Sequence, residues 1–272
     1  MSKKIWNNYS ENITLVTCFF ELNRGKWNKF NRTNGDYYKY FETWARIHND
    51  LIVYCSVEHK EEIIAIREKY GRKNTRVVVI DDIFGVDAEL YNSIKQSISN
   101  PLSIEYRLTP ENPECWNVEY NYIMLMKEWC INHAIQHNYA SGMIAWIDFG
   151  FNHGDFYYKK AEEFDFLWEH KFSYKVHAIL VKPVDDLPIF EIVRNMNTYI
   201  QGCMIVAPDK LWIELWNLVR KNMVALNKVG LMDDDQTILL MAYRENSKIF
   251  EFENGQWFSH FAKWSDRRFT IQ

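Results

Sequence analysis

The segment ITLVTCFF, residues 13–20, is a continuous run of apolar and β-branched residues. Such a run is typical of a strand that is covered on both faces, as in a parallel sheet. Two similar runs follow, LIVYCSV at 51–57 and RVVVID at 76–81. Apolar residues recur at helical spacing from Tyr37 to His48 and again within 58–70. The first 82 residues therefore alternate strand, helix, strand, helix, strand, which predicts a parallel sheet with crossover helices.

The remaining segments extend this α/β pattern. Helices are expected at 87–99, 118–138, 209–230 and 233–245, and strands at 143–149, 176–183, 202–208 and 248–253. Residues 100–116 contain three prolines and are expected to form a loop or insertion. Because no internal repeat or clear linker is present, we expect one domain. Residues 1–150 would form its nucleotide-binding half, and residues 151–272 its acceptor and catalytic half.

Composition restricts the classes of protein that need to be considered. The chain has 272 residues, is 47% apolar and 25% charged, and carries a formal net charge of −4, which argues against a general nucleic-acid binder. No run approaches the roughly 20 apolar residues of a membrane span. Lys3 and Lys4 precede the first apolar run, as in a signal peptide. The polar segment WNNYSEN separates these lysines from the run and argues against that interpretation. The five widely spaced cysteines predict reduced thiols and a cytoplasmic protein.

Asp148, Phe149 and Gly150 form a D-F-G triplet at the end of the expected strand 143–149. Protein kinases use this triplet to hold magnesium, but the chain lacks their glycine-rich loop, V-A-I-K strand and H-R-D loop. Ligands of open parallel sheets bind beyond the carboxyl ends of the strands. We therefore expect Asp148 to meet the loop after Phe20, and the pair at 81–82, in one crevice. The simpler alternative is that Asp148 only caps a turn.

A metal–phosphate site of another kind fits this position better. Glycosyltransferases of the GT-A type place a D-x-D motif at the end of a central strand, where it holds Mn²⁺ or Mg²⁺ against the diphosphate of a nucleotide sugar. Here Gly150 replaces the second aspartate. Asp148 is the first expected metal ligand, and His153, Asp155 and the late His260 are candidates to complete the site, with His260 preferred. A structural histidine is the alternative in each case.

Three motifs together identify a family resemblance. TLVTCFFELNRGKW at 14–27, AWIDFGF at 145–151 and DDQT at 234–237, with a helix that carries Lys127, resemble the HtrL/YibB family of bacterial proteins. That family is tied to lipopolysaccharide and surface-glycan loci and is regarded as GT-A-like. The resemblance implies an α/β fold of GT-A type and a metal-dependent sugar transfer, most simply from a UDP-sugar. It also implies a glycan or lipid-linked acceptor, reached in the cytoplasm or at the inner face of the membrane.

The first motif suggests a donor site. By the resemblance, Thr17 and Phe19 would contact uracil or ribose, and Arg24 and Lys26 would reach phosphate oxygens. A solvated basic loop is the alternative. Lys127 could approach the same diphosphate from its helix, or it could be an ordinary surface lysine.

The segment LMDDDQTILL, residues 231–240, suggests the catalytic group. Capping of the following helix accounts for one of its three acids, but not readily for all of them. In inverting enzymes of this type, an acid here takes the proton of the acceptor hydroxyl; Asp235 is slightly preferred over Asp234. In retaining enzymes, a D-Q pair, here Asp235 and Gln236, contacts the donor sugar. Gln201 and Gly202 are expected beside the acceptor.

Two other functions remain open. A non-catalytic glycan-binding protein of the same fold would account for Gly150 and for the many aromatic residues, which stack well on sugar rings. A sugar-phosphate nucleotidyltransferase would need a glycine-rich phosphate loop directly after the first strand. FELNRGKW, residues 20–27, is poor in glycine.

Overall fold

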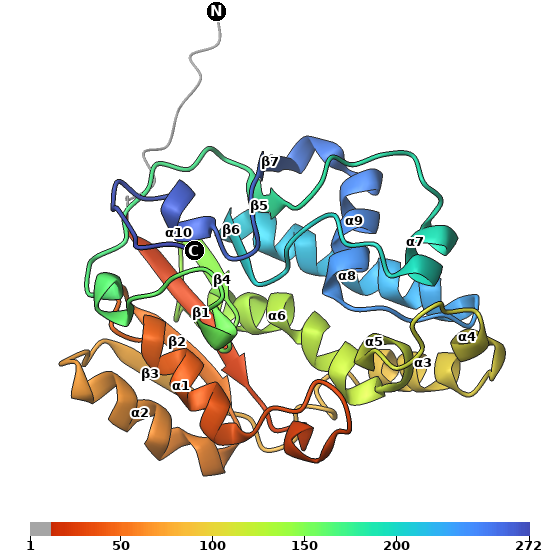
Figure 1. Ribbon diagram of the computed structural model, residues 1–272, viewed down its shortest axis with the longest axis horizontal. Helices are drawn as coiled ribbons and strands as arrows, with labels where there is room; N and C mark the ends of the chain where they lie inside the picture. Colours follow the sequence, from red (N-terminus) through yellow and green to blue (C-terminus); the bar gives the residue numbers. More distant parts are fainter. Residues whose placement is uncertain (1–11) are drawn as a thin grey trace, which may run out of the picture.

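The computed structural model describes residues 12–272, which form a seven-stranded sheet in the order β3-β2-β1-β4-β6-β5-β7 (Figure 1). Neighbouring strands pair in parallel, except that β6 runs antiparallel to β4 and to β5. The fold class predicted from the sequence, α/β with a mostly parallel central sheet flanked by helices, is therefore confirmed. Strands from both predicted halves of the chain join this one sheet. The strands are β1 Ile13–Phe19, β2 Leu51–Cys55, β3 Thr75–Val79, β4 Met143–Ile147, β5 Val176–Leu180, β6 Met204–Pro208 and β7 Phe250–Asn254.

Two layers of helices cover the sheet, one on each face (Figure 1). Because side chains alternate along a strand, Val16 and Trp146 pack into the core under α3, α6, α8 and α9. Leu15 and Ile147 pack into the opposite core, under α1, α2 and α10. The longer helices are α1 Asn34–Trp44, α2 Lys60–Lys69, α3 Ala88–Ile98, α6 Val118–Gln136, α8 Asp209–Lys228 and α9 Asp235–Glu245. None of the described helices is long and apolar enough to cross a membrane.

Several short elements lie outside the predicted pattern. The expected loop 100–116 contains two single-turn helices, and α1 begins with a capping box. Thr33 is the N-cap, and Asp36 completes a capping box from the third helical position. The short helices are α4 Leu102–Glu105, α5 Pro113–Trp116, α7 Ile189–Asn195 and α10 His260–Lys263, with 3₁₀ turns at Arg24–Lys26, Val57–His59, His153–Asp155, Ala161–Phe164 and Ser247–Ile249.

The strand directions bring three chain segments to one edge of the sheet. β1 ends at Phe19 and β4 ends at Ile147, so the residues after them lie at the carboxyl edge. Since β6 is antiparallel and Met204 pairs with Ile147, the residues just before β6 reach the same edge. Asp81 and Asp82 do not join them, because β3 is the outermost strand, three positions from β4, or roughly 14 Å at the usual spacing of about 4.8 Å per strand.

Candidate active site

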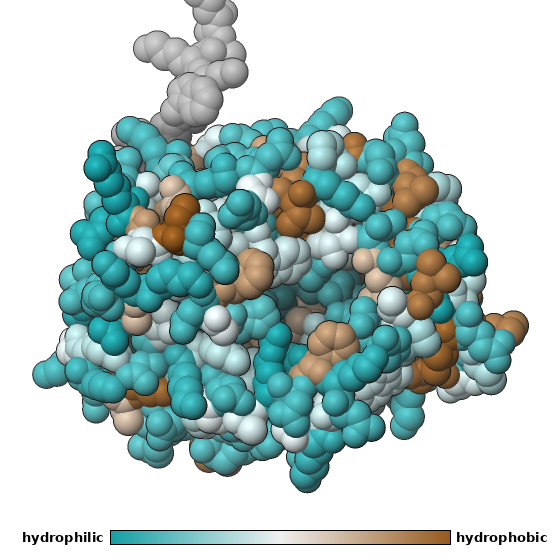
Figure 2. Space-filling model, in the orientation of Figure 1, coloured by the Kyte–Doolittle hydropathy of each residue, from teal (hydrophilic) through white to brown (hydrophobic). Residues whose placement is uncertain are grey.

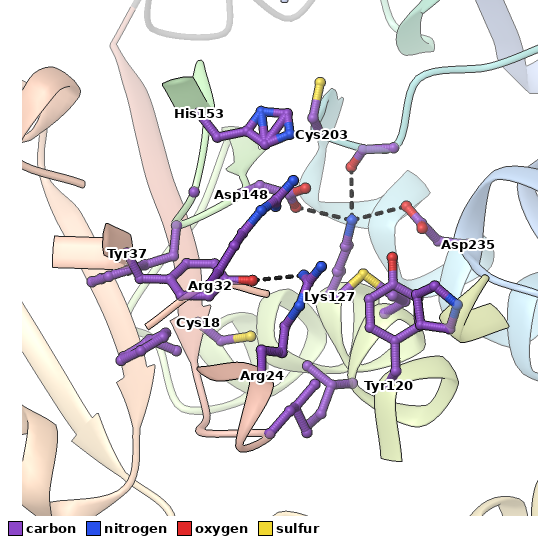
Figure 3. Close-up of a pocket in the computed structure, with 18 of the residues that line it drawn as sticks. Cys18, Arg24, Arg32, Tyr37, Tyr120, Lys127, Asp148, His153, Cys203 and Asp235 are labelled. Carbon is purple, nitrogen blue, oxygen red and sulfur yellow. Dashed lines mark hydrogen bonds and ion pairs between the residues drawn. The ribbon is translucent and has the colours of Figure 1, made fainter. Parts of the chain in front are cut away.

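A pocket of about 470 Å³ opens at this edge. Figure 2 shows a hollow near the middle of a largely hydrophilic face, and Figure 3 shows the side chains around the pocket. The loop after β1, the start of α1, the middle of α6, the end of β4 and the start of α9 all contribute to its wall. The lining residues that carry the argument below are Phe19, Arg24, Arg32, Tyr37, Tyr120, Lys127, Trp146, Asp148, His153, Gly202, Asp235, Gln236 and Trp257.

Lys127 lies at the centre of the pocket floor, where its side chain is only 2% exposed. Its Nζ lies 2.9 Å from Asp148 Oδ1 and 2.9 Å from Asp235 Oδ2, and it donates to the carbonyl oxygen of Gly202 at 3.0 Å (Figure 3). Burial disfavours the charge on Lys127, but the two carboxylates outweigh it and raise the lysine pKa above its ordinary value. Lys127 is therefore a buried cation that ties β4 to α9.

Asp148 is the more accessible of the two carboxylates, with 31% of its side chain exposed. Its Oδ1 also accepts a hydrogen bond from Trp146 Nε1 at 2.7 Å, and its backbone nitrogen donates to the carbonyl of Cys203 at 2.8 Å. Trp146 and Lys127 thus contact the same oxygen, so the carboxylate is held in one orientation just after the end of β4. A simple turn cap would not need this anchoring.

The opposite wall of the pocket is basic and aromatic. Arg24 donates to Tyr37 Oη at 2.7 Å, and its guanidinium lies over the rings of Trp27 and Tyr120. Arg32 also lines the pocket and has no hydrogen-bond partner for its guanidinium within residues 12–272. Phe19, from the end of β1, lies behind this wall, where its buried ring stacks on Phe149 at 4.6 Å. Guanidinium groups beside aromatic faces suit a ligand that combines phosphate with a planar ring.

The three acids at the start of α9, Asp233 to Asp235, make different contacts. Asp233 pairs with the buried Arg107 at 3.6 Å, and Asp235 pairs with Lys127. Asp234 is the N-cap of α9 and accepts from the backbone nitrogen of Gln236 at 3.1 Å. Burial, with the nearby charge of Asp235, raises the pKa of Asp234 well above its ordinary value. Only Asp234 is both free of a cationic partner in the described chain and placed beside a second cavity.

That second cavity measures about 170 Å³ and adjoins the first. Asp234 and Thr198 line it, and Gln236 and Trp257 line both cavities. Thr198 donates to Gln236 Oε1 at 2.7 Å, which fixes the amide between the two spaces. Amide, hydroxyl and carboxyl groups beside an indole ring are the surroundings that a sugar requires.

The metal site expected from the sequence does not fit the side chains that the structure brings together. Asp148 and His153 line the pocket, but His260 does not. His260 is fully buried against Phe151 and Trp264, and burial lowers its pKa to about 3. Within residues 12–272 no group of three or more His, Cys, Asp or Glu side chains could hold a metal.

Gly150 shows why a second carboxylate is missing from the D-x-D position. A β-carbon on Gly150 would lie 3.1 Å from Cε1 of Tyr37 and 3.3 Å from its Cδ1. Any longer side chain would have to displace that ring, which is itself held by Arg24. The aromatic wall of the pocket therefore favours glycine here, and a second aspartate would have to shift the ring of Tyr37.

Three other residues predicted for the site lie outside this pocket. Thr17 is buried, because alternation along the strand places its side chain on the same face as Leu15, which packs into the core. It also lies two residues before the strand end. Lys26 is exposed on the turn that carries Arg24. Gln201 is buried and holds the C-terminal segment, donating to the carbonyl of Gln256 and accepting from the nitrogen of Phe258.

Four residues of the site were missed by sequence reasoning. Arg32, Tyr120 and Glu114 line the pocket, and Glu128 lies under it with both carboxyl oxygens buried and unpartnered within the described chain. Burial raises the pKa of Glu128 to about 8. The burial of Glu128 could have been predicted from the sequence. Glu128 follows Lys127 in the helical segment IMLMKEWCI, residues 123–131, which is otherwise apolar all round. A helix that is apolar all round is buried, and its charged residues are buried with it.

Comparison with known proteins identifies a matching family, a relative in that family and a solved structure of distant similarity. The sequence profile described as "Bacterial protein of unknown function (HtrL_YibB)" matches residues 11–265. Protein HtrL of Escherichia coli strain K12 is 29% identical over 266 residues, which cover 91% of this chain and 90% of that protein. The apo crystal structure of mouse xyloside xylosyltransferase 1 is 12% identical, with a TM-score of 0.47, and covers 93% of this chain and 91% of that one.

Proposed function

The chain belongs to the HtrL/YibB family, and we propose that it is a glycosyltransferase that moves a sugar from a nucleoside diphosphate, most simply UDP, to a hydroxyl group of a glycan. The observation that carries the proposal is the anchored carboxylate of Asp148, at the end of a central strand. It faces Arg24 and Arg32 across a pocket with aromatic walls. A nucleotide sugar offers a matching set of groups: a planar base, two phosphates and a ring of hydroxyls.

Each part of the donor has a partner in the pocket. Tyr37 provides an aromatic face for the base, and the two arginines provide donors for the diphosphate oxygens. Asp148 Oδ1 is already held by Trp146 and Lys127, so its other oxygen is the one directed to ribose or sugar hydroxyls. This arrangement binds and orients the donor, and the arginines also stabilise the negative charge that develops on the departing diphosphate.

The transfer step requires a base for the acceptor. The acceptor oxygen forms a bond to the anomeric carbon, and the bond from that carbon to the diphosphate oxygen breaks, with its electron pair leaving on the nucleoside diphosphate. The hydroxyl proton passes to a carboxylate. We propose Asp234 for this role, because its raised pKa and its position beside the second cavity suit a base, whereas Asp235 is engaged by Lys127. If the enzyme retains configuration, we propose that Gln236, which lines both cavities, contacts the donor sugar.

The family resemblance alone suggests the wider setting. The acceptor would be a bacterial surface glycan, such as a lipopolysaccharide core or a capsule, and the protein would act in the cytoplasm or loosely attached to the inner face of the membrane. Manganese or magnesium, expected from the sequence, is left out of this proposal because the donor set around Asp148 does not suit it.

Incubation of the pure protein with a panel of nucleotide sugars tests the proposal. We expect slow hydrolysis of one donor, measured as release of its nucleoside diphosphate, and loss of that hydrolysis in Asp148→Asn. Binding to a glycan array with no hydrolysis of any donor would contradict the proposal and would favour a non-catalytic glycan-binding protein.

A further inference from the structure

The shell around Lys127 has the composition of a cation site. Two carboxylate oxygens and one backbone carbonyl oxygen surround Nζ at 2.9, 2.9 and 3.0 Å. An ammonium group has three donors, so these three oxygens satisfy it completely. The distances are those of charge-assisted N–H···O contacts and are longer than the roughly 2.0–2.1 Å at which magnesium binds oxygen.

A divalent cation would have little else to bind in this pocket. Asp235 is 2% exposed and its Oδ2 is committed to Lys127, while Gly150 carries no side chain to supply a second carboxylate. Asp148 and His153 are the remaining expected ligands that line the pocket, and one carboxylate with one imidazole would need water and the phosphates of the ligand itself to complete a Mg²⁺ or Mn²⁺ shell.

The pocket has a second source of positive charge for an anionic ligand. Arg24 contacts Tyr37 Oη and the carbonyl of Phe30, and neither Arg24 nor Arg32 has an ion pair with a described residue. Lys127 meanwhile offsets one of the two negative charges of Asp148 and Asp235, which reduces their repulsion of a diphosphate. The charges needed to hold a diphosphate are thus all supplied by side chains.

We propose that Lys127 is the permanent cation of this site, and that the protein binds a nucleoside diphosphate through Arg24 and Arg32 without a divalent metal. The identity of the ligand rests on the proposed function. The role of Lys127 rests on the three oxygens around its ammonium group.

Calorimetric titration of the parent protein with UDP, in EDTA and in excess Mn²⁺, tests the inference directly. We expect the two dissociation constants to agree within about threefold, or less than 1 kcal/mol. Binding that is more than about tenfold tighter with Mn²⁺ would overturn the inference and leave the proposed donor class intact.

If UDP fails to bind in either condition, the donor class is wrong. Titration of the parent protein with Mn²⁺ alone, followed by the paramagnetic resonance of the free ion, then decides the role of Lys127. Binding of one ion that Asp148→Asn abolishes would overturn that role, and no binding would support it.

Removal of the ammonium group supplies the complementary test. In Lys127→Ala, the two carboxylates and the carbonyl of Gly202 would face a vacant cation position. We expect Mn²⁺ to raise the melting temperature of this variant, but not that of the parent or of Lys95→Ala, which removes an exposed lysine from α3. An equal rise in the parent would count against the inference, as would a folded Lys127→Ala that does not respond. If the variant does not fold, the parent titrations decide.

Discussion

Gly202 and Asp235 approach so closely that a β-carbon on Gly202 would lie 1.6 Å from Asp235 Oδ2. The same carboxylate oxygen contacts Lys127, and the carbonyl of Gly202 contacts that lysine as well. The glycine is therefore part of the shell around the ammonium group, and only a residue without a side chain allows α9 to reach it.

Gly202→Ala should therefore break the contact between Lys127 and Asp235. Because that contact is buried, we expect the free energy of unfolding to fall by roughly 3–5 kcal/mol, measured by urea denaturation. Gly35→Ala is the control: its β-carbon would have only an ordinary contact with Thr33, and alanine favours the first turn of α1. In an Asp235→Ala background, the added cost of Gly202→Ala should drop below about 1 kcal/mol. An equal cost in both backgrounds would show that Asp235 is not what the side chain meets.

Arg32→Met should weaken UDP binding without loss of stability. The guanidinium lines the pocket and has no hydrogen-bond partner in the described chain, so the folded state loses little with it. A charge-assisted contact to phosphate is worth roughly 1.5–3 kcal/mol, which predicts a dissociation constant about tenfold or more higher. Lys26→Met, on the same loop but outside the pocket, should leave the constant unchanged. Equal effects of the two variants would indicate a diffuse basic loop and no defined phosphate site.

The fold was predictable from the sequence because most of its strands, among them β1, β2, β4 and β6, are buried on both faces. All seven apolar runs proved to be strands, and the alternation of strands and helices reflects the crossover connections. The direction and the order of the strands within the sheet were harder to predict. Nothing in GCMIVAP indicates that β6 runs antiparallel, yet that direction brings Gly202 beside Asp148. The sequence distance between Asp81 and Asp148 likewise does not reveal that their strands are three positions apart.

Some of the residues that line the pocket were predicted, and the differences between prediction and structure have physical causes. Asp148, Arg24 and Phe19 line the pocket because strand ends determine where they lie. His260 was preferred as a ligand from the resemblance, but the aromatic tail packs it into the core. Lys127 was expected to be an ordinary surface lysine more readily than a phosphate ligand, and it is neither exposed nor free. Its burial depends on the packing of α6 between the sheet and α8, which only the apolar residues around it foreshadow.

Asp148→Asn should abolish donor turnover while the protein stays folded. The amide keeps the shape of the carboxylate and one oxygen for Trp146, but it removes the charge that faces the pocket. We expect nucleotide-sugar hydrolysis to fall by about a hundredfold or more. Asp155→Asn is a matched control on the following turn, where Asp155 is exposed with a φ of 50°, a conformation that asparagine adopts readily. Unchanged hydrolysis in Asp148→Asn would reduce this aspartate to a turn residue.

Glu128 should make the protein less stable as pH rises. Its pKa, raised by burial to about 8, exceeds the value near 4.3 that an unfolded chain would have, so the folded state holds a proton that the unfolded state releases. Its contribution to stability therefore falls between about pH 4.3 and pH 8 and is lowest above that range. Glu128→Met should raise the free energy of unfolding at about pH 8.5 by roughly 1–3 kcal/mol, and less at about pH 5. Glu119→Met, exposed on the same helix, should show no such pH dependence.

Asp234 and Asp235 should differ when each is replaced by asparagine. Asparagine caps a helix as well as aspartate does, so Asp234→Asn should keep the stability of α9 and the affinity for UDP. It cannot take a proton at neutral pH, and transfer should slow by about a hundredfold or more. Since burial raises the pKa of Asp234, the parent's rate should climb with pH through an apparent pKa above the ordinary range of aspartate, and the variant should lose that rise.

Asp235→Asn should instead lower stability, because Lys127 loses a buried partner. Asp209→Asn, at the start of α8 and outside both cavities, should change neither property. If Asp235→Asn is the variant that keeps UDP affinity and loses both the rate and the pH-dependent rise, the base is Asp235 and the assignment to Asp234 is wrong.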